Sequence, residues 1–143
     1  MLDQRSRTME TPKTILILGG GVGGVVTAIE LRKKLGRQHR IILIDREQAH
    51  VFAPSLLWLM VGLRKPGAIQ RPLGGLKRKG MLRRYSAQVD VRHGEIEKID
   101  PTRLAVTVAG EEIIADYIVV ALGAELAPET IPGLNKSGFN FYT

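Results

Sequence analysis

The 143-residue chain contains no cysteine. Within these residues there is therefore no disulfide framework, no thiolate metal site and no cysteine nucleophile. No apolar run approaches the roughly 18 residues that a membrane-spanning helix needs, and the longest candidate is Leu56–Leu63. With 44% hydrophobic and 24% charged residues, the composition is typical of a globular domain and excludes a disordered tail. The length suits one domain and is too short for separate cofactor and substrate domains.

Acidic residues are missing from one internal segment. No Asp or Glu occurs from Gln48 to Val89, and the rest of the chain has 13 basic and 14 acidic residues, so this segment accounts for the whole net charge of +7. Its eight cations are Arg64, Lys65, Arg71, Lys77, Arg78, Lys79, Arg83 and Arg84. A pI near 10.1 suggests nucleic acid as a partner. The segment has few interleaved aromatics and no recognisable binding motif, so we predict no nucleic-acid partner.

Two interpretations of this segment stay open. It is either a solvated face of a helix rich in lysine and arginine, or a surface that rests near anionic lipid headgroups. The adjacent apolar stretch Leu56–Leu63 contains Trp58. We expect Trp58 to pack in the core.

Two apolar runs flank a helical pattern near the start of the chain. Lys13–Leu18 and Arg40–Ile44 are aliphatic runs typical of buried parallel strands. Between them, Val22–Leu35 has apolar residues at helical spacing, and Gly36 is placed to end the helix. This order predicts a βαβ unit with a right-handed crossover.

The first run ends in the glycine-rich sequence Gly19-Gly20-Gly21-Val22-Gly23-Gly24. In a G-x-G-x-x-G motif, Gly19 permits the tight turn, Gly21 permits close approach of a pyrophosphate, and Gly24 permits close packing of the helix. Phosphates bind at such a helix N-terminus. Asp45 ends the second run, 21 residues after Gly24, where a carboxylate hydrogen-bonds ribose. Together these features favour a dinucleotide site over a structural turn.

The acid at position 45 also bears on which nucleotide binds. A carboxylate repels a 2′-phosphate, so Asp45 disfavours NADP. Arg46 either is a solvated neighbour or covers the adenine face.

Short strands dominate the second half of the chain. The predicted strands are Gln88–His93, Glu95–Ile99, Leu104–Val108 and, after a break near Asp116, Tyr117–Ala121. A turn at Ala109-Gly110 makes Leu104–Ile114 an antiparallel hairpin. The fold class is therefore α/β: a Rossmann-like parallel sheet with a βαβ start and an antiparallel hairpin or meander insertion.

Three further motifs are Phe52-Ala53-Pro54, His93-Gly94-Glu95-Ile96 and Ala121-Leu122-Gly123. With the glycine loop and Asp45, they resemble the N-terminal part of the two-dinucleotide-fold flavoprotein (pyridine nucleotide-disulfide oxidoreductase) superfamily. Within it, the chain is most similar to sulfide:quinone oxidoreductases and type II NADH dehydrogenases. The stretch from Phe52 to Pro66, FAPSLLWLMVGLRKP, is particularly similar to the sulfide:quinone oxidoreductase group.

This resemblance implies FAD at the first glycine loop. It implies that residues 19–24 hold the FAD pyrophosphate, that Asp45 holds its adenosine ribose and that the Ile96 backbone meets the adenine. It also places the turn Ala121-Leu122-Gly123 close to the cofactor and Pro54 near the flavin ring, with a proline that only rigidifies the loop as the alternative. For Trp58, a stack on the flavin and a surface facing a quinone or a membrane are the alternatives to core packing. Leu122 stands where the family usually has a threonine, which removes a hydroxyl group.

The resemblance further implies electron transfer from sulfide or NADH to a quinone, by a cytoplasmic protein peripheral on the inner face of the membrane. A homodimer stays open. Sulfide-oxidising members use cysteines, and this chain has none. Either the reactive cysteines lie in further sequence, or the protein moves electrons by flavin alone. We predict no catalytic residue and no metal ligand here, and His39, His50 and His93 are expected to be surface or packed residues.

Residues 1–12 are expected to be a disordered lead-in, and residues 13–143 the N-terminal portion of a FAD-binding domain in a longer protein. The spacing of Phe139, Phe141 and Tyr142 suggests that a further element begins there. We expect a yellow parent protein and weak or no retention of FAD by residues 1–143 alone. An NAD(H)-binding module of a dehydrogenase and an inactive regulatory fragment remain alternatives, although the hairpin and the Ala121-Leu122-Gly123 turn argue against the NAD(H) module.

Overall fold

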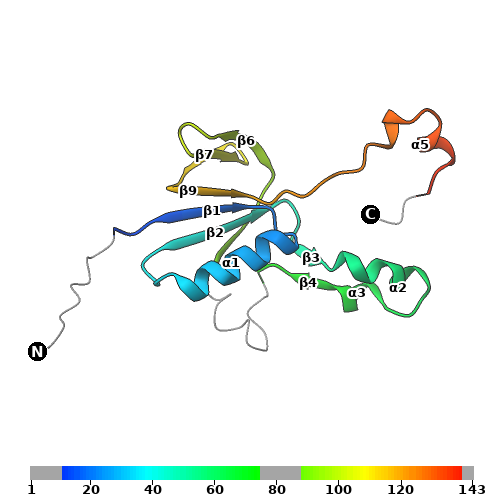
Figure 1. Ribbon diagram of the computed structural model, residues 1–143, viewed down its shortest axis with the longest axis horizontal. Helices are drawn as coiled ribbons and strands as arrows, with labels where there is room; N and C mark the ends of the chain where they lie inside the picture. Colours follow the sequence, from blue (N-terminus) through cyan, green and yellow to red (C-terminus); the bar gives the residue numbers. More distant parts are fainter. Residues whose placement is uncertain (1–10, 75–87, 140–143) are drawn as a thin grey trace, which may run out of the picture.

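The computed structural model describes residues 11–74 and 88–139. Its centre is a parallel sheet in the order β5-β2-β1-β9, which comprises β5 (Asp90–His93), β2 (Arg40–Asp45), β1 (Thr14–Leu18) and β9 (Tyr117–Val120). Helix α1 (Val22–Lys34) joins β1 to β2 and covers one face of the sheet (Figure 1). The predicted βαβ unit and the α/β fold are therefore confirmed, and the helix ends one residue earlier than expected.

An antiparallel meander covers the opposite face of the parallel sheet. It consists of β6 (Ile96–Asp100), β7 (Ala105–Val108) and β8 (Glu111–Ile114). The turn between β7 and β8 has φ angles of 50° at Ala109 and 78° at Gly110, which suit a tight two-residue hairpin. The predicted hairpin is confirmed, and the break before β9 falls at Ala115 and Asp116.

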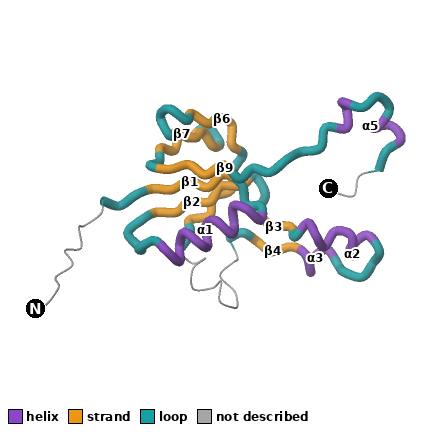
Figure 2. Tube along the Cα trace, in the orientation of Figure 1, coloured by secondary structure: helices purple, strands orange, loops and turns teal. Residues whose placement is uncertain are grey.

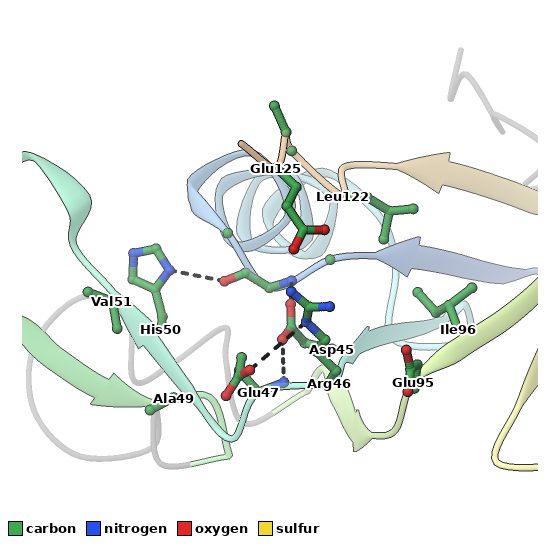
Figure 3. Close-up of a pocket in the computed structure, with 15 residues that line it drawn as sticks. Asp45, Arg46, Glu47, Ala49, His50, Val51, Glu95, Ile96, Leu122 and Glu125 are labelled. Carbon is green, nitrogen blue, oxygen red and sulfur yellow. Dashed lines mark hydrogen bonds and ion pairs between the residues drawn. The ribbon is translucent and has the colours of Figure 1, made fainter. Parts of the chain in front are cut away.

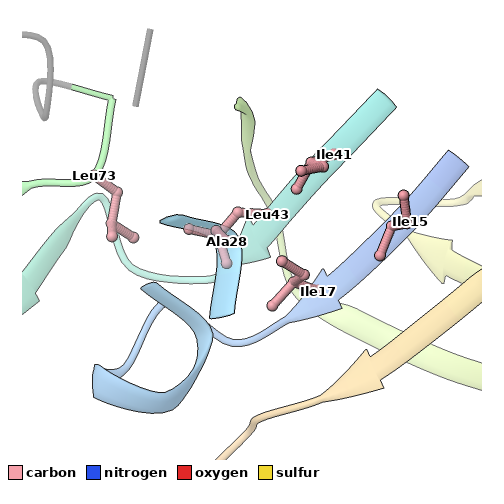
Figure 4. Packing of buried hydrophobic residues seen from close by; sticks show 6 residues of the cluster. All are labelled: Ile15, Ile17, Ala28, Ile41, Leu43 and Leu73. Atoms are coloured by element: carbon pink, nitrogen blue, oxygen red, sulfur yellow. The ribbon is translucent and has the colours of Figure 1, made fainter. Parts of the chain in front are cut away.

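The core lies on both faces of β1 and β2, because successive side chains of a strand point to opposite sides. Ile15, Ile17, Ile41 and Leu43 face α1, where they pack with Ala28 and Leu73 (Figure 4). Leu16, Leu18, Ile42 and Ile44 face the meander, where they pack with Val106 and Val108. Burial on both faces explains why these strands are continuous apolar runs in the sequence.

An arm projects from the sheet between β2 and β5 (Figures 1 and 2). It spans residues 49–72, with β3 (Ala49–Val51) and β4 (Gln70–Pro72) paired at its base. Its tip contains η1 (Ala53–Ser55), α2 (Leu56–Met60) and α3 (Pro66–Ile69).

The arm corrects two of the sequence-based expectations. Trp58 is 48% exposed, so the prediction that it packs in the core is wrong: the arm carries α2 away from the sheet. Among the described cations of the acid-free segment, Arg64, Lys65 and Arg71 all lie outside the helices, so the helix-face interpretation is wrong for this part. The other five cations lie outside the described residues.

The end of the described chain holds η2 (Pro128–Thr130) and α5 (Leu134–Ser137), away from the sheet (Figure 1). Phe139 is exposed, whereas Phe141 and Tyr142 lie outside the described residues, as does most of the predicted lead-in. In the described ranges no helix is both long enough and apolar enough to cross a bilayer.

A buried arginine holds the C-terminal end of α1. Arg32 is 5% exposed, and its guanidinium donates hydrogen bonds to the carbonyls of Gly36 and His39, the latter at 3.0 Å. Burial lowers the pKa of Arg32. The contacts fix the turn that leads from α1 into β2.

Asp116 joins the starts of β1 and β9. Its carboxylate accepts hydrogen bonds from the Thr14 N–H at 2.8 Å and from the Lys13 ammonium at 2.9 Å. These two contacts hold the pKa of Asp116 below its usual value.

Replacement of Asp116 by Asn tests this junction, because it removes the charge and keeps the shape. A carboxyl group with a lowered pKa in the folded state stabilises the fold fully above its unfolded pKa of about 3.9, and this contribution is lost as the pH falls through the folded value. We expect Asp116→Asn to lower Tm at neutral pH, with the difference from the wild type shrinking below about pH 4. Thermal unfolding followed by circular dichroism measures it. Glu111→Gln, at an exposed position of β8, is the control, and a pH-independent difference for Asp116→Asn would contradict the assignment.

Candidate dinucleotide-binding site

A cleft of about 540 Å³ opens at the carboxyl ends of β1, β2 and β9 (Figure 3). This edge is where parallel α/β sheets bind ligands. The cleft brings together eight of the thirteen residues predicted to contact the cofactor: Gly19, Gly20, Gly21, Asp45, Arg46, Ile96, Leu122 and Gly123. Segments from Gly19 to Gly123, distant in sequence, thus form one surface.

The glycine loop has the close contacts that its pattern predicts. Gly19 has φ of 105°, and a Cβ there would lie 2.4 Å from the Ala121 carbonyl oxygen. A Cβ at Gly24 would lie 1.8 Å from the Gly19 carbonyl oxygen, so a side chain there would separate α1 from the loop. At Gly21, a Cβ would meet nothing within 4 Å. Gly21 therefore leaves open space beside the backbone, as a bound pyrophosphate requires.

Asp45 holds the loop from the end of β2. One of its carboxylate oxygens accepts a hydrogen bond from the Gly20 N–H, and the other accepts one from the Glu47 N–H at 2.6 Å. Each carboxylate oxygen can accept a second hydrogen bond. Asp45 can therefore order the loop and still receive ribose hydroxyls.

The charged side chains around the cleft are mostly acidic. Asp45, Glu47, Glu95 and Glu125 line it, whereas Arg46 is the one arginine or lysine among the lining residues that the structure describes. Arg46 is exposed and lies 4.0 Å from the Glu47 carboxylate, which agrees with a solvated neighbour. Attraction for a pyrophosphate must therefore come from backbone N–H groups at the start of α1, where no acidic residue occupies the first turn. The carboxylates also disfavour an additional 2′-phosphate.

The remaining five predicted residues lie around the cleft rather than in its lining. In the first turn of α1, Val22 and Gly23 are exposed and Gly24 is buried. The Ala121 backbone packs on Gly19. Pro54 lies in η1 of the arm, outside the lining residues. The cofactor contacts assigned to all thirteen residues stay predictions.

Several cleft residues were missed from the sequence. Glu95 and Glu125 follow β5 and β9 closely, so the rule that sites form at the carboxyl ends of strands could have found them. His50, on β3, hydrogen-bonds the Gly20 carbonyl at 3.0 Å, a contact across 30 positions that no local pattern indicates. Within residues 11–74 and 88–139, no group of three His, Asp or Glu side chains is placed to hold a metal ion.

The parallel sheet, glycine loop, helix start and acid at the end of β2 together define a dinucleotide-binding domain. A sequence model of the family described as pyridine nucleotide-disulphide oxidoreductase matches residues 13–143. The chain belongs to this family.

The most similar relatives include quinone reductases. A sulfide-quinone reductase of Aquifex aeolicus is 35% identical over 115 residues, which cover 80% of this chain and 25% of the relative. A demethylphylloquinone reductase of Synechocystis is 30% identical over 135 residues, which cover 90% of this chain and 32% of the relative. The crystal structure of the sulfide:quinone oxidoreductase from Aquifex aeolicus matches with a TM-score of 0.80 and 31% identity, over 92% of this chain and 29% of that one.

These comparisons confirm the predicted superfamily and its cofactor. Proteins of this family are FAD-binding flavoproteins, so FAD is the cofactor, and the open space at Gly21 beside a helix start fits its pyrophosphate. The NAD(H) alternative for this first loop is set aside. The chain spans about a quarter to a third of the length of the relatives that it matches.

Alanine substitutions at Gly21 and Gly24 distinguish an effect on ligand binding from an effect on stability. A Cβ fits at Gly21 in the free protein, so Gly21→Ala should change the free energy of unfolding by less than about 0.5 kcal/mol. The same methyl group enters the space meant for pyrophosphate, so ADP binding should weaken at least about tenfold, which corresponds to 1.4 kcal/mol.

Gly24→Ala is the matched variant. Its methyl group meets the Gly19 carbonyl, so we expect the free energy of unfolding to fall by about 1–3 kcal/mol. Urea unfolding measures the free energy of unfolding of both variants, and calorimetric titration measures their affinity for ADP. Unchanged ADP affinity in Gly21→Ala would contradict the placement of the pyrophosphate.

Proposed function

We propose that this chain is the FAD-binding, N-terminal portion of a flavin-dependent oxidoreductase that passes electrons from sulfide or NADH to a quinone. The observation that carries the proposal is the glycine cradle facing Asp45 across an open cleft, in a chain similar to quinone reductases over most of its length. FAD, when bound, accepts and returns the two electrons.

In this proposal the chain supplies binding and orientation. The N–H groups at the start of α1 bind the pyrophosphate, Asp45 receives the adenosine ribose, and the Ile96 backbone contacts the adenine. The turn at Ala121-Leu122-Gly123 lies beside Gly19 and keeps water from that side of the cofactor. Residues 13–143 contain no cysteine, so sulfur chemistry would need cysteines elsewhere in the complete protein.

The test is to purify the complete protein and record its absorbance. We expect a yellow protein with flavin bands, and reduction of a soluble ubiquinone analogue on addition of either sulfide or NADH. The donor that supports turnover identifies the branch of the family. A colourless protein that cannot be reconstituted with FAD would refute the proposal. A flavoprotein that reduces no quinone with either donor would refute the assigned acceptor.

We also propose that the arm contacts an anionic membrane surface, as a protein peripheral on the inner face of the cytoplasmic membrane would. Its tip exposes several large apolar side chains without acidic neighbours in sequence. These are Phe52, Leu57, Trp58, Met60, Val61 and Leu63. Amphipathic aromatic side chains favour the boundary between lipid and water, and cations beside them attract anionic headgroups.

The tip is ordered by one arginine. The Arg64 guanidinium lies 4.3 Å from the centre of the Trp58 ring and donates a 2.8 Å hydrogen bond to the hydroxyl of Ser55, which is fully buried. These contacts hold Trp58 at the surface of the arm. Lys65 and Arg71 are exposed, and with Arg64 they are the cations of the acid-free segment that the structure describes.

The single tryptophan makes this surface directly measurable. On mixing with vesicles that contain phosphatidylglycerol, the Trp58 fluorescence should shift to the blue, and the shift should be smaller with phosphatidylcholine alone. Neutralising Lys65 or Arg71 to Gln should weaken vesicle binding about fivefold per charge, from about 1 kcal/mol each.

Leu63→Ser tests the apolar contribution, and Ile114→Ser, at another exposed apolar side chain on β8, is the matched control. Only Leu63→Ser should weaken binding. Vesicle binding that is insensitive to anionic lipid, or equally reduced by both variants, would refute the proposed contact of the arm with an anionic membrane.

A further inference from the structure

The peptide planes on both sides of Gly20 are held by side chains from outside the glycine loop. Asp45 accepts the hydrogen bond of the Gly20 N–H, and His50 meets the Gly20 carbonyl oxygen at 3.0 Å (Figure 3). A carbonyl oxygen only accepts hydrogen bonds, so His50 Nδ1 carries the proton and donates it. Asp45 and His50 therefore fix one peptide plane each.

The base of the arm also packs against this loop. A Cβ at Gly20 would lie 2.6 Å from the Cδ1 atom of Leu73, which is 3% exposed and follows β4. The Leu73 N–H donates to the Gln48 carbonyl at 2.9 Å, just before β3. His50, on β3, and Leu73, just after β4, thus approach Gly20 from the two ends of the arm.

We propose that His50 is a positioning residue that sets the phosphate-binding orientation of the Gly20–Gly21 peptide. A trans peptide is planar, so a carbonyl fixed toward His50 fixes the Gly21 N–H in the opposite direction. Glycines on both sides make rotation of this peptide easy. Rotation would exchange the positions of the N–H and the carbonyl oxygen, and a carbonyl oxygen beside a pyrophosphate repels it.

Among the described residues, few positively charged side chains lie near the loop to attract an anion. Carboxylates predominate among the charged side chains that line the cleft, so the direction of each N–H group decides the affinity for a diphosphate. His50 supplies that direction from the arm. This inference rests on the proposed binding of the FAD pyrophosphate at the loop, and it assigns His50, which lines the cleft, a role through the Gly20 carbonyl.

Three substitutions separate this role from packing. His50→Leu removes the donor and keeps the bulk, whereas in His50→Asn the amide nitrogen takes nearly the place of Nδ1. His50→Gln carries its amide nitrogen near the place of Nε2. His93→Leu is the control, because His93 is an exposed histidine at the end of β5 that does not line the cleft.

The measurements are the Kd of FAD, ADP and AMP for the purified complete protein freed of bound flavin, with Tm recorded for each variant. His50→Leu and His50→Gln should weaken FAD and ADP about tenfold, the effect of one lost hydrogen bond, and should weaken AMP less. His50→Asn should recover most of the affinity, and His93→Leu should match the wild type.

The outcomes distinguish the two proposals. If the wild type binds FAD and ADP and His50→Leu binds them equally well, the role of His50 is refuted and the proposed function stands. A lowered Tm with equal losses for ADP and AMP, unrelieved by His50→Asn, would show a merely structural histidine. If the wild type binds neither FAD nor ADP, both proposals fail.

Discussion

The close approach of α1 to the end of β1 is the constraint on which the site depends. No side chain fits at Gly24, because the Gly19 carbonyl occupies the place of its Cβ, and none fits at Gly19, because the Ala121 backbone does. The start of the helix, the end of β1 and the exit from β9 are thereby held together. In the proposed function a pyrophosphate binds at a helix N-terminus that no side chain blocks. Gly19 and Gly24 bring the helix start into place by close packing, and Gly21 leaves the space beside it open.

The second constraint is the double-sided burial of β1 and β2. With α1 on one face and the meander on the other, these strands lie in two separate apolar clusters. Their carboxyl ends therefore occupy fixed positions, and Asp45 reaches the Gly20 N–H from one of them. The arm is built differently, since its tip exposes its apolar side chains, whereas His50 at its base and the adjoining Leu73 approach the loop. Both of these contacts are made with Gly20.

Much of this architecture could be predicted from local pattern. Continuous apolar runs predicted the buried strands, helical spacing predicted α1, and the glycine spacing with Asp45 predicted the loop. The Ala109-Gly110 turn predicted the hairpin. The expectation for Trp58 failed because its sequence is as apolar as that of a core strand. Hydrophobicity alone does not reveal whether a second layer of structure packs against an apolar segment. Among the described residues, no such layer covers Trp58, and neither core cluster includes it.

Local patterns in the sequence are sufficient to predict the βαβ unit and the glycine loop, because these depend on spacings within about 30 residues. The family resemblance rests on motifs spread from Gly19 to Gly123, each of which can be recognised without knowing its contacts. Which residues share the cleft is visible only in the folded chain. Glu95, Glu125 and His50 reach it from three separate segments, and the acidic character of the lining appears only when they are brought together. Local periodicity carries no information on contacts across such distances, since these arise from the packing of whole elements. The position of His50 on the Gly20 carbonyl is therefore a property of the fold.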